Sequence, residues 1–308
     1  MNSRKIPSIS KQAGFTLIEF ATVLVTIIII IGAILKANEL VSGAEIKNTI
    51  SQVERYNSAA RTFSIKYGYL PGDIPNPVAS QFGFQSRETS PGQGDGDGII
   101  QGFNGDGKKY GWMQCGEPLM FWIDLSKAGV IQSNFSSAST DKCSEKDIVE
   151  NFEKYYPSAG IGKNTYFYVA SIYSSAKSDD YNLNSSFSGI NMFVISQIHK
   201  IAFESQNGEI IGGKGISVYD AYSIDKKIDD GIPTSGHVIT ASSLDGGFSF
   251  SNNDVNMLKD GNKLPSENAV PNSKTSCYDN DNKAGEQVKY STEYNGSKKN
   301  CSLAIKFK

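Results

Sequence analysis

The hydrophobic residues of this chain are unevenly distributed, and the longest apolar run lies near the N-terminus. From Phe15 to Leu35 almost every residue is apolar. About 20 helical residues cross the roughly 30 Å hydrocarbon core of a bilayer, so this run can span a membrane as one helix. One carboxylate, Glu19, lies near its start. An acid inside lipid is costly and is by default a functional group that needs a positively charged partner.

Beyond Lys36 the pattern changes from continuous to one-sided. Apolar and small residues recur at steps of three and four, which is the spacing of one face of a helix. The positions on this face are Ile46, Ile50, Val53, Asn57, Ala60, Ser64 and Tyr67. No proline occurs between Pro7 and Pro71. The two segments therefore predict one helix from about Phe15 to Lys66, roughly 75 to 80 Å long.

After this helix, Pro71 and Pro75 force turn and extended conformations. The rest of the chain mixes helical and strand patterns. Helices are predicted from Glu117 to Ala128, with Gly129 as the C-terminal stop, and along the face of Val218, Ala221, Ile224 and Ile228, ending at Gly231 and Pro233. Aromatic and β-branched runs predict strands at 166–173, 190–195 and 248–250. Mixed elements of this kind indicate an α+β head.

The second of these helices carries Asp225 and Asp229 one turn apart, with Lys226, Lys227 and Asp230 beside them. This spacing would let two carboxylates share a site. A solvated charged face is the simpler interpretation, and we expect it here.

The polar segment before the apolar run carries Arg4, Lys5 and Lys11 and no acid. By the positive-inside rule the N-terminus stays in the cytoplasm and the chain after Lys36 lies across the membrane. A cleaved secretory signal peptide is one alternative, but about 21 apolar residues exceed its usual run of roughly 7 to 15. A plain single-span anchor is another alternative, and it does not explain Glu19.

The residues from Lys11 to Glu19, with Gly14, Phe15 and the acid in that order, closely resemble the class III signal of type IV pilins and type II secretion pseudopilins. The resemblance implies that a prepilin peptidase cuts after Gly14 and that Phe15 is then N-methylated. The cut leaves the apolar helix in place and creates a new amine at Phe15. The resemblance further implies that Glu19 of an incoming subunit pairs with the Phe15 terminus of a neighbour, which offsets the cost of burying the carboxylate.

The same resemblance implies a domain order and a set of partners. Residues 1–14 are the leader, 15–36 the membrane or filament-core half of the helix, 37–68 its amphipathic half, and 69–308 a pilin-like head. The expected fold is a long N-terminal helix packed on an antiparallel β-sheet. Expected partners are the prepilin peptidase/methyltransferase, other pilin or pseudopilin subunits and an inner-membrane assembly platform. We expect a single-pass inner-membrane protein with its head in the periplasm, which then enters a pilus or pseudopilus.

A glycine-rich stretch after the helix contains candidate metal ligands. Asp95, Asp97, Asn104 and Asp106 alternate with glycines, and oxygen ligands on a pliable backbone suit calcium. The match to an EF-hand loop is partial, because Ile99 stands at the fifth position. Asp-Gly and Asn-Gly pairs are equally typical of hairpin turns. Both interpretations remain open, so calcium is the single cofactor that the sequence raises.

Four cysteines follow the membrane-spanning run, where an oxidising compartment permits disulfides. They allow three connectivities. Pairing of Cys115 with Cys143 and of Cys277 with Cys301 is favoured because each bond closes a local loop. The second bond would fix the C-terminus, as the C-terminal disulfide does in many pilins. A zinc site is disfavoured, since there is no Cys-x-x-Cys and no histidine at ligand spacing from a cysteine.

Charge and motif content argue against two other classes of function. The chain has 30 basic and 32 acidic residues, and no basic block indicates nucleic-acid binding. No nucleophile elbow, zincin helix or phosphate-binding loop is present, and the triplet Ser235-Gly236-His237 is best explained by a turn. We therefore expect a non-enzymatic filament subunit, with a large head suited to a minor, low-copy position. The alternative is a membrane-anchored adhesin or binding protein that does not polymerise.

Overall fold

The computed structural model describes residues 16–85, 94–103, 109–135, 148–172, 182–183, 189–202, 208–244, 247–250, 255–256, 271, 276–283 and 287–307. The fold is α+β, with a long N-terminal apolar helix and a helix packed on an antiparallel β-sheet, as the sequence predicts. Contacts divide the chain into two compact units, Met1–Ala44 and Glu45–Lys308. Each unit is described by itself.

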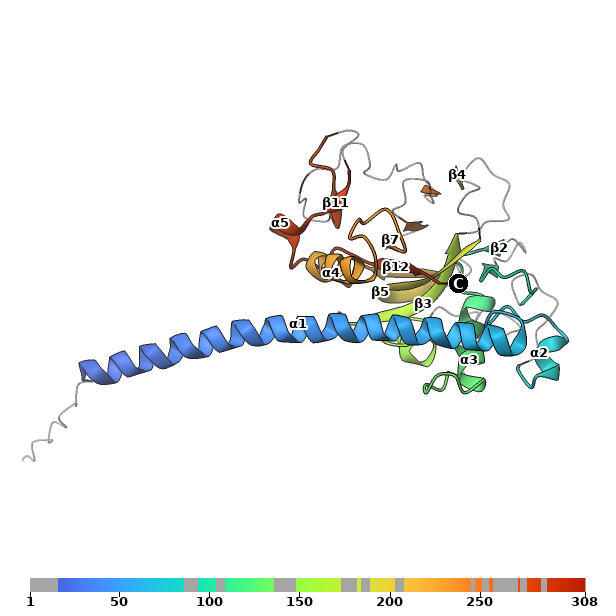
Figure 1. The fold of residues 1–308 in the computed structure, drawn as a ribbon, viewed down its shortest axis with the longest axis horizontal. Helices are drawn as coiled ribbons and strands as arrows, with labels where there is room; N and C mark the ends of the chain where they lie inside the picture. The colour runs from blue at the N-terminus through green and yellow to red at the C-terminus, as the bar shows by residue number, and fades with distance from the viewer. Residues whose placement is uncertain are drawn as a thin grey trace, which may run out of the picture. The chain divides into compact units, whose positions relative to one another are not determined.

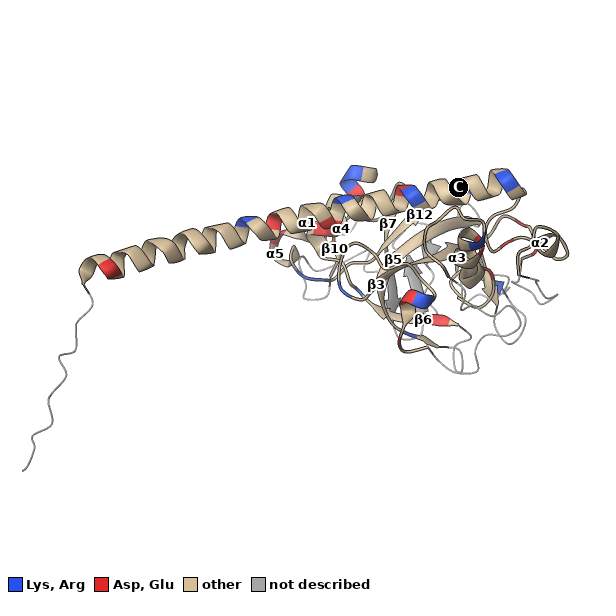
Figure 2. Cartoon of the chain, turned by 90° about the horizontal axis from the view of Figure 1, so that it is seen from below, with Lys and Arg blue, Asp and Glu red and all other residues tan. Residues whose placement is uncertain are grey.

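Helix α1 is one continuous element from Leu17 to Tyr67 (Figure 1). Its end follows from the sequence, because Gly68 adopts a φ of +79° and its N–H donates to the Ser64 carbonyl oxygen at 2.8 Å. Between Leu17 and Val41 the large apolar side chains are exposed, and the colouring of Figure 2 marks few charged residues on this stretch. In the described part of the chain, α1 is the one helix long and apolar enough to span a membrane.

The second half of α1 belongs to the unit that contains the sheet, and its buried face differs from the predicted one. The buried residues are Ile46, Thr49, Val53, Tyr56, Ala59, Ala60 and Phe63. Ile50, Asn57, Ser64 and Tyr67 were predicted on this face but are half-buried at its border. The face is rotated because the rings of Tyr56 and Phe63 fill the core, and periodicity alone did not single them out.

The main sheet has six strands in the order β3-β5-β12-β7-β8, with β6 paired to β5, and every pair is antiparallel (Figure 1). Its strands are β3 Thr165–Ile172, β5 Ile190–Ala202, β6 Glu209–Gly213, β7 Val238–Leu244, β8 Gly247–Phe250 and β12 Leu303–Lys306. The strands predicted at 166–173, 190–195 and 248–250 correspond to β3, β5 and β8. In the centre, Leu303 of β12 lies opposite Ile195 of β5 and Thr240 of β7.

Helix α3, Glu117–Lys127, lies where the sequence predicts it. It ends in a Schellman motif: Gly129 has a φ of +68°, Val130 N–H donates to the Leu125 carbonyl and Gly129 N–H to the Ser126 carbonyl. Every residue from Glu117 to Leu125 is buried, so α3 is an interior helix that carries carboxylates into the core.

Aromatic side chains join the second half of α1, α3 and the sheet. The Tyr56 ring lies 5.0 Å from that of Trp122 and 5.3 Å from that of Phe167. Phe193 of β5 stacks on Phe307 with ring centroids 4.2 Å apart. Edge-to-face and stacked pairs of this kind stabilise a core beyond simple burial. These rings form the centre of the head.

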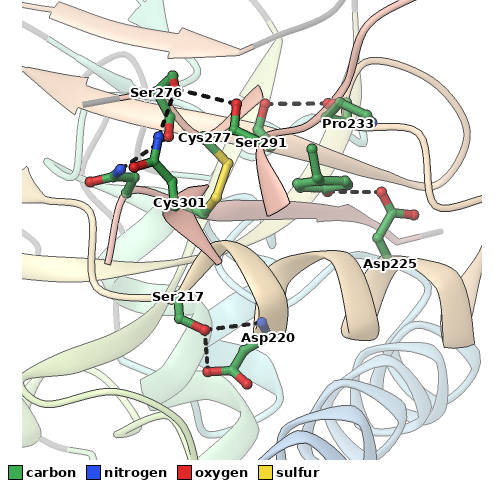
Figure 3. Close-up of a disulfide and its surroundings, with 12 residues drawn as sticks. Ser217, Asp220, Asp225, Pro233, Ser276, Cys277, Ser291 and Cys301 are labelled. Carbon is green, nitrogen blue, oxygen red and sulfur yellow. Dashed lines mark hydrogen bonds between the residues drawn. A yellow bond between two sulfur atoms is a disulfide. The ribbon is translucent and has the colours of Figure 1, made fainter. Parts of the chain in front are cut away.

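The remaining elements are short, apart from helix α4, Val218–Ile228. The Ser217 hydroxyl caps α4 by accepting the Asp220 N–H at 3.0 Å (Figure 3). The short elements are α2 Val78–Gln81, β1 Gly102–Phe103, β2 Lys109–Tyr110, η1 Phe152–Lys154, β4 Asn182–Leu183, β9 Val255–Asn256, β10 Tyr278–Asp279, β11 Lys289–Tyr290 and α5 Thr292–Asn295.

Candidate functional site

The predicted assembly residue Glu19 lies in the first turn of α1, on an exposed apolar surface. Its Oε2 accepts the Thr16 N–H at 2.8 Å and the Thr16 hydroxyl at 2.7 Å, and the Glu19 N–H donates to Thr16 Oγ1 at 3.3 Å. This reciprocal pair is a capping box, Thr-x-x-Glu, which satisfies free N–H groups at a helix start. Gly14 and Phe15 lie outside the described residues, so the cleavage and methylation sites stay predictions.

The capping role of Glu19 was missed at the sequence level, although the spacing of Thr16 and Glu19 is its signature. Both hydrogen bonds that the Glu19 carboxylate accepts from Thr16 are made to Oε2. Among the described residues nothing donates to Oε1. The acid is therefore held by its own helix and still has one oxygen for a partner.

A second site forms where the glycine-rich loop wraps around two buried carboxylates. Asp73 accepts the Gly96 N–H at 2.8 Å and the Gly98 N–H at 2.9 Å. Glu117, at the start of α3, accepts the Gly94 N–H at 3.0 Å and the Gln101 N–H at 2.9 Å.

The loop can follow this path only with glycine at position 94. Gly94 has a φ of +83°, and a Cβ there would lie 2.3 Å from the Ile74 carbonyl oxygen. The other side of the loop is held by Asn191 of β5, which accepts the Ile100 N–H at 2.8 Å and donates to the Gly98 carbonyl at 2.9 Å. The path of the loop is thus fixed by side chains from the start of the head, α3 and the sheet.

The electrostatics of this site are set by burial. Burial raises the pKa of Asp73 to about 7, and the nearby Asp97 adds to the shift. The pKa of Glu117 is raised well above its ordinary value by burial and then by the Asp73 charge. Their backbone hydrogen bonds oppose these shifts. The two carboxylates therefore strongly favour either a proton or a cation.

The structure places two of the four predicted calcium ligands, Asp95 and Asp97, in different surroundings. Asp95 belongs to the site, because one oxygen each of Asp73, Asp95 and Glu117 lie within 4.8 Å of one another. The Asp97 carboxylate instead accepts the Ile99 N–H and the Gln101 side-chain amide. Asn104 and Asp106 lie outside the described residues. Asp73 and Glu117 were not predicted as site residues, because nothing in the sequence near either of them indicates that they meet.

A third cluster corrects the expectation of a solvated charged face on α4. Asp225 is fully buried and accepts the Tyr290 hydroxyl at 2.8 Å and the Gly231 N–H at 3.1 Å. One carboxylate oxygen each of Asp225, Asp229 and Asp230 lie within 4.8 Å of one another. The three acids lie together because the chain turns back after α4, and backbone N–H groups beyond the helix donate to Asp229 and Asp230. Ser235-Gly236-His237 lies in this turn, as predicted.

Asp225 should make the head less stable as the pH rises. Burial, and then the charges of Asp230 and Asp229, raise its pKa to about 7, whereas an unfolded aspartate titrates near about 3.9. Between these values the folded protein holds a proton that the unfolded chain releases, so the free energy of unfolding falls from pH 4 to pH 7. Asp225→Asn cannot ionise and still offers an amide to Tyr290 and Gly231. We expect the variant to be more stable than wild type by roughly 2 kcal/mol at pH 8.

The measurement is chemical unfolding at pH 5 and pH 8. Asp281→Asn, which changes an exposed acid paired with Lys289, is the control. Its free energy of unfolding should change between pH 5 and pH 8 as much as that of wild type. If the free energy of unfolding changes equally with pH in wild type and in Asp225→Asn, the buried carboxylate does not set this pH dependence.

One of the two predicted disulfides lies within the described residues. Cys277 and Cys301 are bonded, with Cα atoms 5.1 Å apart (Figure 3). Figure 3 shows this bond near α4, the helix that carries Asp225. Cys115 is buried, but Cys143 lies outside the described residues, so their pairing stays a prediction.

Comparison with known proteins does not assign the chain to a family. No protein-family model matches it, and no curated protein and no solved structure shows significant similarity to it.

Proposed function

We propose that this protein is a filament subunit of the type IV pilin or type II secretion pseudopilin kind. The observation that carries the proposal is a carboxylate, Glu19, in the first turn of an exposed apolar helix that continues into the core of the head. A helix of this kind can lie in a membrane before assembly and in a filament core afterwards.

The chemistry of Glu19 supports a charge-paired assembly step. An acid on an apolar helix needs a positive partner, and cleavage after Gly14 would create an ammonium group at Phe15. In the proposed filament, Glu19 of one subunit binds the Phe15 terminus of its neighbour through Oε1, while Oε2 keeps the capping contact with Thr16. The proposed partners are a prepilin peptidase/methyltransferase, further subunits and an inner-membrane platform.

The N-terminus of the mature protein tests this proposal directly. Expressed with a prepilin peptidase, the chain should lose residues 1–14 and begin with N-methyl-Phe15. Intact-mass and N-terminal peptide mass spectrometry measure both changes. Gly14→Val is the matched control and should stay uncut. A wild-type protein that keeps Met1 would reject the proposal.

The second candidate is a membrane-anchored adhesin or binding protein that does not polymerise. The single apolar helix fits an anchor equally well, so this function predicts retention of residues 1–14 and no filaments. Within the filament proposal, the large head favours a low-copy position, because bulky subunits crowd a dense helical fibre. In either case the head is placed outside the cytoplasm by the basic leader.

A further inference from the structure

We propose that the head binds one calcium ion between Asp73, Asp95 and Glu117, with the side-chain oxygen of Gln101 as a fourth protein ligand. The three carboxylates come from the start of the head, the glycine-rich loop and the first turn of α3. One oxygen of each lies within 4.8 Å of the others. Two ligands that bind the same calcium at about 2.4 Å are at most about 4.8 Å apart, so the three oxygens fit one coordination sphere. This site goes beyond the proposed filament function and does not depend on it.

Gln101 supplies an observation that is independent of the acids. It is fully buried, and its backbone N–H and side-chain Nε2 donate to Glu117 and Asp97. Gln101 is therefore bonded through its backbone to one acid of the site and through its side chain to the neighbouring Asp97. Its Oε1 is buried and accepts no hydrogen bond from any described residue. A buried amide oxygen without a donor is costly, and calcium accepts amide oxygens as ligands.

The site also lacks a permanent positive charge for its two buried acids. In the described ranges, neither Asp73 nor Glu117 forms an ion pair, whereas Asp95 pairs with Lys109. Lys109 comes from β2 and is partly exposed, with 21 % of its side-chain surface accessible. Its flexible side chain can leave Asp95 when a divalent cation arrives. Lys109 is thus a competitor for the site.

The surroundings favour calcium over magnesium. Calcium accepts irregular sets of six to eight oxygens, including backbone carbonyls and water, whereas magnesium demands a near-octahedral set. The ligands here come from the turn after α1, from a glycine-rich loop and from the first turn of α3, which is an irregular set. A cavity of about 400 Å³, lined by Asp73, Gly96 and Gly98 with Arg61 and Tyr69, borders the site at Asp73. Water in this cavity can complete the coordination.

Titration of the full-length protein in detergent with calcium chloride, after removal of metal with EDTA, tests the site. We expect one calcium per chain, with Kd on the order of 10⁻⁴ to 10⁻³ M, and magnesium at least tenfold weaker. Calcium should also raise the midpoint of thermal unfolding. Absence of binding up to 10 mM calcium would overturn the proposal and would leave a water molecule as the partner of Gln101.

Variants separate this ligand set from a general effect of acidic charge. Asp95→Asn, at an exposed position, should weaken calcium binding at least tenfold, and Glu117→Gln should do the same if it folds. Asp97→Asn removes a neighbouring charge outside the set and should change Kd less than threefold. Lys109→Gln removes the competitor and should tighten binding. Equal affinities in Asp95→Asn and wild type would reject the site. Processing after Gly14 is independent of calcium, so failure here leaves the filament proposal standing.

Discussion

Replacing Glu19 by glutamine should prevent filament assembly while the protein still enters the membrane and is processed. Glutamine serves in a capping box as well as glutamate does, so the contacts with Thr16 survive and the charge alone is lost. An ammonium group buried without its partner costs about 3 to 5 kcal/mol, which corresponds to a loss of at least about a hundredfold in assembly. The measurement is the fraction of subunit recovered in sheared filaments, normalised to the membrane pool.

Glu39→Gln is the matched control for this experiment. Glu39 is an exposed glutamate on the same helix and pairs with Lys36 at 2.8 Å. Exposed pairs of this kind contribute little, about 0 to 1 kcal/mol, so this variant should assemble at nearly the wild-type level. Normal filaments from Glu19→Gln would mean that the cap suffices and that no charge pair forms between subunits.

Removing the Cys277–Cys301 disulfide should destabilise the head by roughly 3 kcal/mol. The bond spans 24 residues of sequence, and its loss frees this loop in the unfolded chain. Cys301 lies two residues before β12, which is in the middle of the sheet, so fraying there reaches the core. Urea unfolding of the Cys277→Ser/Cys301→Ser double variant, monitored by tryptophan fluorescence, measures the change.

Ser297→Ala tests whether any change in this segment has the same effect. Ser297 is exposed close to Cys301, and such substitutions usually change stability by less than about 0.5 kcal/mol. Equal unfolding midpoints for the double variant and wild type would show that the non-covalent contacts of β12 hold the C-terminal segment without the bond.

The sequence was most informative about helix bounds, which depend on residues that are neighbours in the chain. The absence of proline between Pro7 and Pro71 and the long apolar run predicted a single helix, and α1 has nearly those bounds. Gly129 predicted the end of α3 for a similar reason, because a left-handed residue there favours glycine. Both predictions depend on residues that are neighbours in the sequence, which is why they could be made without knowledge of tertiary contacts.

The predictions failed where distant segments decide the outcome. Tyr56 and Phe63 lie in the core because α3 and the sheet leave space for their rings, and the helical period cannot reveal that space. Asp73 and Glu117 are far apart in sequence, and the loop between them brings them together. Asp225 looked solvated because its neighbours are charged, yet Tyr290 and the turn after α4 cover it.

The position of β12 limits when the head can fold during synthesis and export. This strand is the last of the described elements along the chain, yet it joins β5 to β7 in the middle of the sheet. A nascent chain that still lacks residues 303–306 has two separate sheet fragments with unsatisfied facing edges. The complete sheet can therefore form only after residues 303–306 have been synthesised, and a chain truncated before β12 would expose the facing edges of β5 and β7.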